Sequence, residues 1–574
     1  MYSLCKLNLL SGGNIMKKNL KRMFALVMAF TILLSLTAML TGCGESIDDP
    51  DRFSEKVDES KTQLYVGYFN GGIGLKWITE AKRLFEEIHP EIQIMIDTGK
   101  DEYASDLLMS NIKTNRQDIY LTDGIAYYKY VNKGGLLADL TEATTTPLTE
   151  YGEDKSIADK MNTSLNAFFQ TKDGKYYAAP YYQSYHHIIY DVDLFDQYSL
   201  WFKDGGGFVS STADKKSAGQ DGEFGTWDDG LPVTYSDFFA MMDRMVARGI
   251  TPITWSGATA DAYLPNFMAS LIADYEGDQY NTNWCYNGEI DVITNRDFTE
   301  SAANTFTLST SDYETVTVTP ENFKDYMHST VGKYYAAKFA KDLCSNSRYR
   351  KYNYAESHTA VQRSFLMSNM EGVDAPIAML IEGGWWMNEA TSVFDEMKVY
   401  DEKYAKENRR FGVMPFPKAD DGSSAEGHTV SPFSGQSAVF ISENSTKKDI
   451  AIEFYRFLHT DQCLKVFAQM SGVLRPYECD FSGIYDSVPY YVQNVIDSAA
   501  DTNFIFRVST GDMYKENAEA LNFMMYDGLM STNWNNVTSA NMMIFFCDNV
   551  AATAKDYLLG MKGAFEKNIP GSLR

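Results

Sequence analysis

Downstream of residue 62, the chain alternates short apolar runs with longer amphipathic segments. Residues 63–70 are a nearly continuous apolar run, typical of a strand buried on both faces. From 77 to 88 the apolar residues recur at helical spacing, and His89-Pro90 ends that helix. Residues 92–96 and 118–122 predict two more strands, the second followed by a Tyr-rich helix. This β-α-β-α order predicts an α/β fold with a largely parallel sheet.

The same alternation continues toward the C-terminus. A helix is predicted from Ser236 to Gly249, since a glycine commonly follows a helix C-terminus, and residues 250–255 predict a strand after it. Further helices are predicted from near Ser445-Thr446 and over 460–472, with a threonine cap at the start of the second. These elements and the absence of a fixed-period repeat argue against a repeat architecture.

The N-terminal 42 residues read as a targeting segment. A basic stretch at 17–22 precedes an apolar stretch at 23–40, which is the pattern of a secretory signal. Its length would also allow a transmembrane helix, so an uncleaved anchor remains an alternative. We expect translation to start at Met16, because residues 1–15 lack the signal pattern.

The residues that follow favour cleavage. Leu40-Thr41-Gly42-Cys43 resembles the lipobox of bacterial lipoproteins, in which the cysteine is diacylated and becomes the first residue of the mature chain. The resemblance implies that a lipid on Cys43 anchors the exported protein at the outer face of the cell membrane. Residues 43–62 are acidic and polar and predict a flexible linker.

Charge and composition narrow the function classes. The 574 residues include 51 Lys and Arg against 77 Asp and Glu, for a formal net charge of −26. The first 42 residues carry five positive charges and no acid, so their removal lowers this charge from −26 to −31. Nucleic acid is therefore not expected as a partner, since phosphate contacts need clustered Lys and Arg. The 38 Tyr, 34 Phe and 8 Trp are more than a core alone usually needs.

The cysteines do not form a recognisable framework. Of the seven, Cys5 lies upstream of the predicted start and Cys43 is the lipid site. The others are scattered, with neither a C-x-x-C motif nor zinc spacing. Most are expected to be buried thiols, and Cys463 with Cys479 is the one pair left open.

Five segments in order resemble bacterial extracellular solute-binding proteins of family 1, which include the maltose-binding proteins. They are 68–72 with 89–92, 118–123 with 134–140, 174–181 with 190–195, 381–386 (Ile-Glu-Gly-Gly-Trp-Trp), and 438–442 with 445–448 and 454–458. The resemblance implies a type II periplasmic-binding-protein-like fold, in which two discontinuous α/β lobes are joined by hinge strands. Carried over, lobe 1 is 60–185 plus 437–476, and lobe 2 is 190–435 plus 477–574.

The resemblance also implies a function. Such a lipoprotein binds a carbohydrate, here an oligosaccharide, in the cleft between its lobes and delivers it to the permease of an ABC transporter. We expect a monomer, no catalysis and no catalytic cofactor. An exported glycosidase with two carboxylates remains an alternative, as does a binding protein for peptides or one that serves a sensory partner.

Candidate ligand-binding residues follow from what a sugar needs. Aromatic rings can cover its apolar faces, and carboxylates and amides can bind its hydroxyls. In open α/β sheets such groups lie just past the carboxyl ends of strands. On this basis and by the resemblance, the candidates are Asn70, Asp123, Tyr182, Trp255, Tyr263, Trp385, Trp386 and Trp534. Asn70 could instead be a turn residue, Asp123 a helix cap, and each aromatic a core residue.

Two segments, 203–232 and 276–330, are rich in Gly, Asp, Asn and Thr and predict inserted loops. The first resembles Gly- and Asp-rich calcium loops of other exported bacterial proteins. Hard Ca²⁺ prefers six to eight oxygen ligands, and the loop lacks EF-hand spacing. The predicted ligands of a structural calcium ion are Asp214, Asp221, Asp228 and Asp229. A solvated acidic turn is the alternative.

The segment 381–386 departs from the solute-binding family at two positions. Glu382 and Gly384 stand where the family usually has Asn and Pro.

Overall fold

A computed structural model describes residues 53, 55–97, 103, 108, 112–114, 117–123, 127–183, 185–258, 260–351, 355–424, 430–432, 437–505 and 542–569. The predicted signal segment, Cys43 and Trp534 lie outside these residues. Among the helices of this part of the chain, none is long and apolar enough to cross a membrane.

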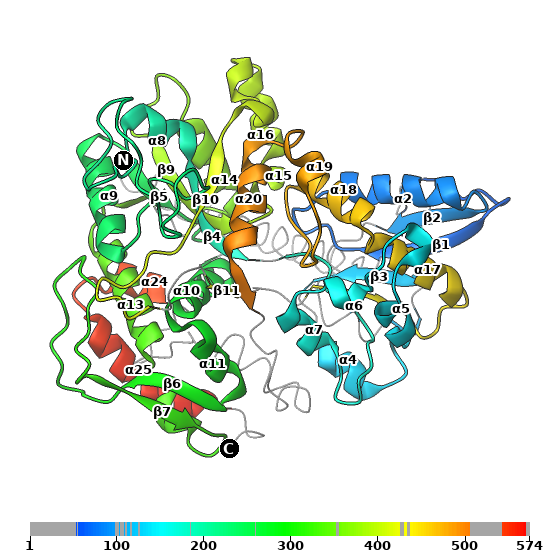
Figure 1. The fold of residues 1–574 in the computed structure, drawn as a ribbon, viewed down its shortest axis with the longest axis horizontal. Helices are drawn as coiled ribbons and strands as arrows, with labels where there is room; N and C mark the ends of the chain where they lie inside the picture. The colour runs from blue at the N-terminus through cyan, green and yellow to red at the C-terminus, as the bar shows by residue number, and fades with distance from the viewer. Residues whose placement is uncertain are drawn as a thin grey trace, which may run out of the picture. The chain divides into compact units, whose positions relative to one another are not determined.

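The first sheet has four strands in the order β12-β3-β1-β2. Figure 1 labels three of them, β1, β2 and β3. They are β1 (Thr62–Tyr68), β2 (Ile92–Asp97), β3 (Ile119–Thr122) and β12 (Ala438–Ile441). β1 is parallel to both β2 and β3, whereas β12 is antiparallel to β3. The three strands predicted between residues 63 and 122 are thus confirmed, in a largely parallel sheet.

The second sheet has five strands in the order β10-β4-β9-β5-β8. They are β4 (His186–Asp191), β5 (Thr251–Thr254), β8 (Arg350–Lys351), β9 (Ile377–Gly383) and β10 (Phe411–Met414). Ile188 and Tyr190 pack on one face and Ile189 on the other, as the two-residue repeat of a strand requires. Both faces are covered by apolar side chains, which explains the continuous apolar runs in these strands.

Two small sheets complete the strands. β6 (Gly288–Ile293) and β7 (Tyr313–Val318) are antiparallel, and β11 (Val430–Pro432) pairs in parallel with β13 (Asn503–Ile505). The helices of seven or more residues are α2 (Lys76–Ile88), α4 (Tyr127–Lys133), α7 (Thr163–Phe169), α8 (Val192–Tyr198), α9 (Tyr235–Ala247), α10 (Ala260–Glu276), α13 (Val331–Ser345), α14 (His358–Ser368), α16 (Thr391–Lys398), α17 (Lys448–Leu458), α18 (Asp461–Ser471), α20 (Tyr490–Asp501), α24 (Met542–Asp548) and α25 (Ala554–Asn568). The shorter helices are α5 (Thr141–Thr145), α6 (Ile157–Lys160), α11 (Thr282–Cys285), α12 (Phe323–Tyr326), α15 (Trp386–Glu389) and α19 (Ser482–Tyr485), with 3-10 turns η3 (Thr149–Tyr151), η4 (Gly277–Asn281), η5 (Glu402–Tyr404) and η6 (Lys406–Asn408).

Local chemistry explains where the predicted helices start and stop. Thr234 and Asp237 form a capping box at the start of α9, and Gly249, just past its end, has φ 76°. Thr460 caps α18 through Cys463 N, and Gly472 ends it in the left-handed conformation. The helix expected from Ser445-Thr446 begins slightly later, at Lys448.

One predicted loop is wrong. The segment 276–330 contains the β6–β7 hairpin, because Ile290 and Val292 alternate toward the core while the residues between them stay partly exposed. Threonines in β7 hid this pattern in a polar composition. The segment 203–232, by contrast, consists of turns and isolated bridges, as expected for a loop.

The two sheets interleave along the chain, and the segments that connect them run side by side. Ala179 pairs with Val439, Tyr182 N donates to Ser437 Oγ at 3.2 Å, and Gln183 N donates to Leu474 O at 2.9 Å. β12 therefore returns to the first sheet after the chain has built the second.

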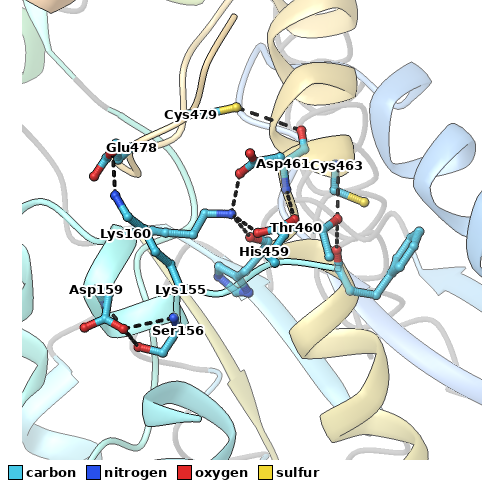
Figure 2. Close-up of polar contacts among 12 residues, drawn as sticks. Lys155, Ser156, Asp159, Lys160, His459, Thr460, Asp461, Cys463, Glu478 and Cys479 are labelled. Atoms are coloured by element: carbon cyan, nitrogen blue, oxygen red, sulfur yellow. Dashed lines mark hydrogen bonds and ion pairs between the residues drawn. The ribbon is translucent and has the colours of Figure 1, made fainter. Parts of the chain in front are cut away.

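Cys463 and Cys479, the pair left open by the sequence, are free thiols. The Cys479 thiol points to the Asp461 carbonyl, 3.9 Å away, and Figure 2 shows the two sulfur atoms well apart. The polar groups around them are already paired: Lys160 Nζ binds Asp461 at 2.5 Å and His459 O at 3.0 Å. The pairing of these two cysteines is therefore not supported.

Candidate functional site

Strand β1 of the first sheet is followed by a glycine-rich turn at the predicted ligand-binding site. After β1, Asn70 Oδ1 accepts a hydrogen bond from Gly74 N at 2.6 Å, which folds the chain back. Gly71 and Gly72 have φ of 48° and 82°, a conformation that side-chain-bearing residues rarely adopt. The side-chain carbonyl oxygen of Asn70 thus holds the turn, and the turn brings the Gly72 backbone close to Trp385. A contact of the Asn70 amide group with a ligand stays a prediction.

The neighbouring strand supplies a carboxylate. Asp123 follows β3 directly, and its Oδ2 accepts a hydrogen bond from the hydroxyl of Tyr182 at 2.8 Å. Tyr182 lies on the connecting segment that leads toward β4. The two candidates therefore meet at the carboxyl end of β3, where the rule for parallel strands places ligand-binding groups.

Trp385 lies at the centre of an aromatic cluster. It follows β9 and is 8% exposed. Its ring centroid is 5.3 Å from His186, 6.2 Å from Tyr263 and 6.3 Å from Tyr182, each in an edge-to-face arrangement. A Cβ on Gly72 would lie 2.7 Å from Trp385 Cδ1, so the glycine turn packs against the indole. We call Tyr182, His186, Tyr263 and Trp385 the Trp385 cluster.

A buried polar network extends from this cluster. Glu382 Oε1 accepts from Gly383 N at 3.0 Å, and Gln362 Nε2 donates to Glu389 Oε2 at 2.8 Å and to Glu382 Oε2 at 3.3 Å. His358 Nε2 lies 3.3 Å from Glu389 Oε1. Burial, reinforced by the charge of Glu389, raises the pKa of Glu382 to about 8. Glu382 is therefore a neutral, hydrogen-bonded carboxyl at pH 7.

One predicted tryptophan, Trp386, does not join the Trp385 cluster. Trp386 is fully buried and packs edge-to-face on Phe411 and Tyr491, on the far side of the second sheet. Trp255 follows β5 and is 1% exposed. The placement of Trp386 as a ligand-contacting residue is corrected to the core, because the adjacent side chains of Trp385 and Trp386 enter different apolar clusters. Trp255 lies in the same apolar cluster as Trp385, and its contact with a ligand stays a prediction.

Sequence reasoning missed four members of the site. His186 is the first residue of β4 and stands out in the sequence only as half of a His pair. Gln362, His358 and Glu389 carry no motif, and only the fold brings α14 and α15 together beneath Trp385.

The acidic loop holds its carboxylates apart. Asp228, which is fully buried, accepts from Gln220 N at 2.6 Å and from Thr226 Oγ1 at 3.0 Å. The other three carboxylates cap separate turns: Asp214 at Ser210 N, Asp221 at Glu223 N and Asp229 at Gly225 N. In the part of the chain that the structure describes, no three His, Cys, Asp or Glu side chains are grouped to hold a metal ion. Calcium binding stays a prediction.

Comparison with known proteins identifies the fold. Residues 72–462 match the family model of the bacterial extracellular solute-binding proteins. The chain belongs to this family. Its solute-binding function and export follow from that membership, and no curated protein sequence matches the chain at a significant level.

Solved structures of solute-binding proteins share the two-lobed α/β fold. The binding protein BlMnBP1 of an ABC transporter from Bifidobacterium animalis subsp. lactis, solved with mannobiose, is 14% identical, with 90% of this chain and 97% of that chain covered and a TM-score of 0.51. The GacH receptor of Streptomyces glaucescens, solved unliganded and with acarbose, is 13% identical over 89% and 99% of the chains (TM-score 0.50). RafE in complex with raffinose is 15% identical over 89% and 100% (TM-score 0.50). At these identities the likeness establishes the fold.

Proposed function

We propose that this solute-binding protein captures an oligosaccharide between its lobes, with Trp385 as the central stacking side chain, and delivers it to an ABC permease. The observation that carries the proposal is the Trp385 cluster. It joins the glycine turn after β1, Asp123 after β3 and Tyr263 of α10 around one indole. The ligands bound by BlMnBP1, GacH and RafE are consistent with this ligand class.

The chemistry of the cluster suits a neutral sugar. Aromatic faces and edges bind the C–H surfaces of a pyranose ring, and Asp123 and Asn70 offer oxygens and an amide for its hydroxyls. Trp385 is nearly buried, so sugar entry requires the lobes to separate by hinge motion.

The site favours binding over catalysis. A glycosidase needs one carboxylic acid and one carboxylate on either side of the scissile bond. Glu382 is 1% exposed and is held by Gly383 N and Gln362, so it does not reach a sugar. Glu389 is tied to Gln362 and His358. The alternative that the ligand is a peptide is tested by including peptides in the ligand screen described below.

A matched pair of variants tests the site. Neutral oligosaccharides and peptides are screened by thermal shift and intrinsic fluorescence, and the best ligand is titrated. Trp385→Ala should weaken its binding at least about tenfold, or about 1.4 kcal/mol. Trp201→Phe, whose indole packs on Tyr190 and Phe195 instead, should leave the affinity unchanged. Equal affinity in Trp385→Ala and the wild type would remove Trp385 from the site.

We further propose that a lipid on Cys43 anchors the protein to the outer face of the membrane. The motif Leu40-Thr41-Gly42-Cys43 after an apolar stretch supports it. Cys43→Ala should abolish incorporation of labelled palmitate and release the chain from the membrane fraction. Palmitate incorporation that persists in this variant would refute the assignment.

A further inference from the structure

Two cysteines that are distant in sequence meet in the packing of α13 against α24. Cys344 lies in the last turn of α13 and Cys547 in α24, 203 residues away. Their sulfur atoms are 3.0 Å apart. Cys344 is 1% exposed, whereas Cys547 is partly exposed. One thiol is thus accessible from solvent, and its partner lies directly behind it.

We propose that Cys344 and Cys547 form a disulfide bond in the exported protein, and that this bond fastens α24 to α13. Both are thiols in this structure. An exported chain leaves the reducing cytoplasm, so a pair at this separation meets the oxidising conditions under which disulfides form and persist.

The pKa shifts of the two thiols, together with their exposure, indicate which one reacts first. The hydrogen bond with Cys344 lowers the pKa of Cys547, and the Arg350 guanidinium acts in the same direction. Burial raises the pKa of Cys344, which also contacts Met543 O at 3.3 Å. The partly exposed Cys547 is therefore the thiolate that attacks first.

The oxidant is a disulfide, either a small one such as oxidised glutathione or that of an extracytoplasmic thiol oxidoreductase. Cys547 thiolate attacks one sulfur, forms a mixed disulfide and releases one thiolate. Cys344 then loses its proton, attacks Cys547 Sγ and releases the second thiolate. The two protein thiols lose two electrons and two protons, and the oxidant is reduced to two thiols.

The three other cysteines in the part of the chain that the structure describes have different partners. Cys285 contacts Asn281 O at 2.8 Å, Cys463 N donates to Thr460 Oγ1, and the Cys479 thiol contacts Asp461 O. Cys463→Ser is therefore a control that should leave the proposed bond intact.

Peptide mapping tests the bond. The full-length chain is isolated from membranes, exposed to oxidised glutathione, alkylated while unfolded and digested. We expect a cross-linked peptide pair containing Cys344 and Cys547, which reduction converts to two separate peptides, in both the wild type and Cys463→Ser. Alkylation of both cysteines without prior reduction would overturn the proposal.

A trapping experiment tests the order of attack. In Cys344→Ser, oxidised glutathione should stop at a mixed disulfide on Cys547. In Cys547→Ser, the buried Cys344 should stay unmodified. Glutathione on Cys344 but not on Cys547 would contradict the assigned order.

Reduction of the disulfide in the wild type should also lower Tm by about 5 °C. An unchanged Tm would show that the bond does not fasten α24 to α13. Because the mapping uses the wild-type chain, it is decisive even if a variant folds poorly.

Discussion

At the scale of single residues, two glycines set where Trp385 lies. A Cβ on Gly383 would come within 2.3 Å of the indole, and one on Gly72 within 2.7 Å. Both positions therefore exclude larger residues for a packing reason, and Gly72 does so for a conformational reason as well.

Gly72→Ala separates these two effects from each other. Gly152 has nearly the same φ (80° against 82°), but a Cβ at that position would meet nothing within 4 Å. In both alanine variants, backbone strain should lower the unfolding free energy by about 1 kcal/mol. In Gly72→Ala, the clash of the new Cβ with Trp385 should add a further loss and should also weaken sugar binding. Urea unfolding and ligand titration measure the two effects. Indistinguishable variants would show that the Gly72–Trp385 contact is unimportant.

Glu382 predicts a pH dependence of stability. Its pKa is about 8 in the folded protein against an ordinary 4.5, because it is buried. Between these values the folded state holds a proton that the unfolded state has lost. The stabilisation is complete below the lower value and is lost as pH rises toward 8, with a slope of up to about 1.4 kcal/mol per pH unit.

Urea unfolding from pH 5 to 8 measures this slope. Glu382→Gln keeps the shape and the neutral state of the side chain and should flatten it. Glu396→Gln, at an exposed ion pair with Arg363, should leave it unchanged. An identical slope in Glu382→Gln and the wild type would contradict the neutral carboxyl.

The residues of the site could be predicted only in part. Position at strand ends selects Asn70 and Asp123; the structure pairs Asp123 with Tyr182, and Asn70 holds the turn whose Gly72 packs on Trp385. Position at a strand end could not choose between Trp385 and Trp386, because the direction of each side chain depends on how the turn after β9 packs. The Glu382 network joins residues from three elements, and no local pattern announces it.

At the scale of elements, amphipathic spacing and capping residues were sufficient for α2, α9 and α18. Each has an apolar face or a threonine cap that is visible in the sequence. The β6–β7 hairpin was missed, because its exposed face is rich in acids and threonines and resembles a loop in composition.

Helix α13 carries a buried ion pair that predicts a large effect. Lys338 Nζ binds Asp342 Oδ2 at 2.7 Å, with side chains 0% and 1% exposed, and also Ala302 O. Lys338→Met should lower the unfolding free energy by about 3 kcal/mol, because it leaves a buried carboxylate without its main partner. Arg363→Ala breaks only an exposed pair and should have little effect in the same denaturation assay. A similarly small effect of Lys338→Met would contradict the prediction.

The predicted calcium site in the loop at 203–232 can be tested by thermal unfolding. The calcium interpretation predicts that EDTA lowers Tm by a few degrees and that excess Ca²⁺ restores it, because a ligand that binds only the folded state stabilises it. Asp214→Asn with Asp221→Asn should remove the response. A Tm indifferent to both reagents would mean that the carboxylate–amide hydrogen bonds alone hold the loop.

At the scale of the whole molecule, the order of the motifs predicted the interleaved lobes. No linker divides the sequence into halves, and β12 returns to the first sheet after the second is complete. Local patterns could not show this, since strand pairing joins residues hundreds of positions apart, such as Ala438 with Thr122. The family resemblance supplied it. The side-by-side connections at Tyr182 and Ser437 are where hinge motion is expected.

The most direct measurement is a calorimetric titration of the full-length protein with a panel of neutral oligosaccharides, followed by chromatography of the recovered sugar. We expect one oligosaccharide class to bind at one site per chain, with micromolar or tighter affinity, and to be recovered uncleaved. The absence of binding by any member of the panel, or recovery of shorter products, would contradict the proposal that this protein captures and delivers a sugar.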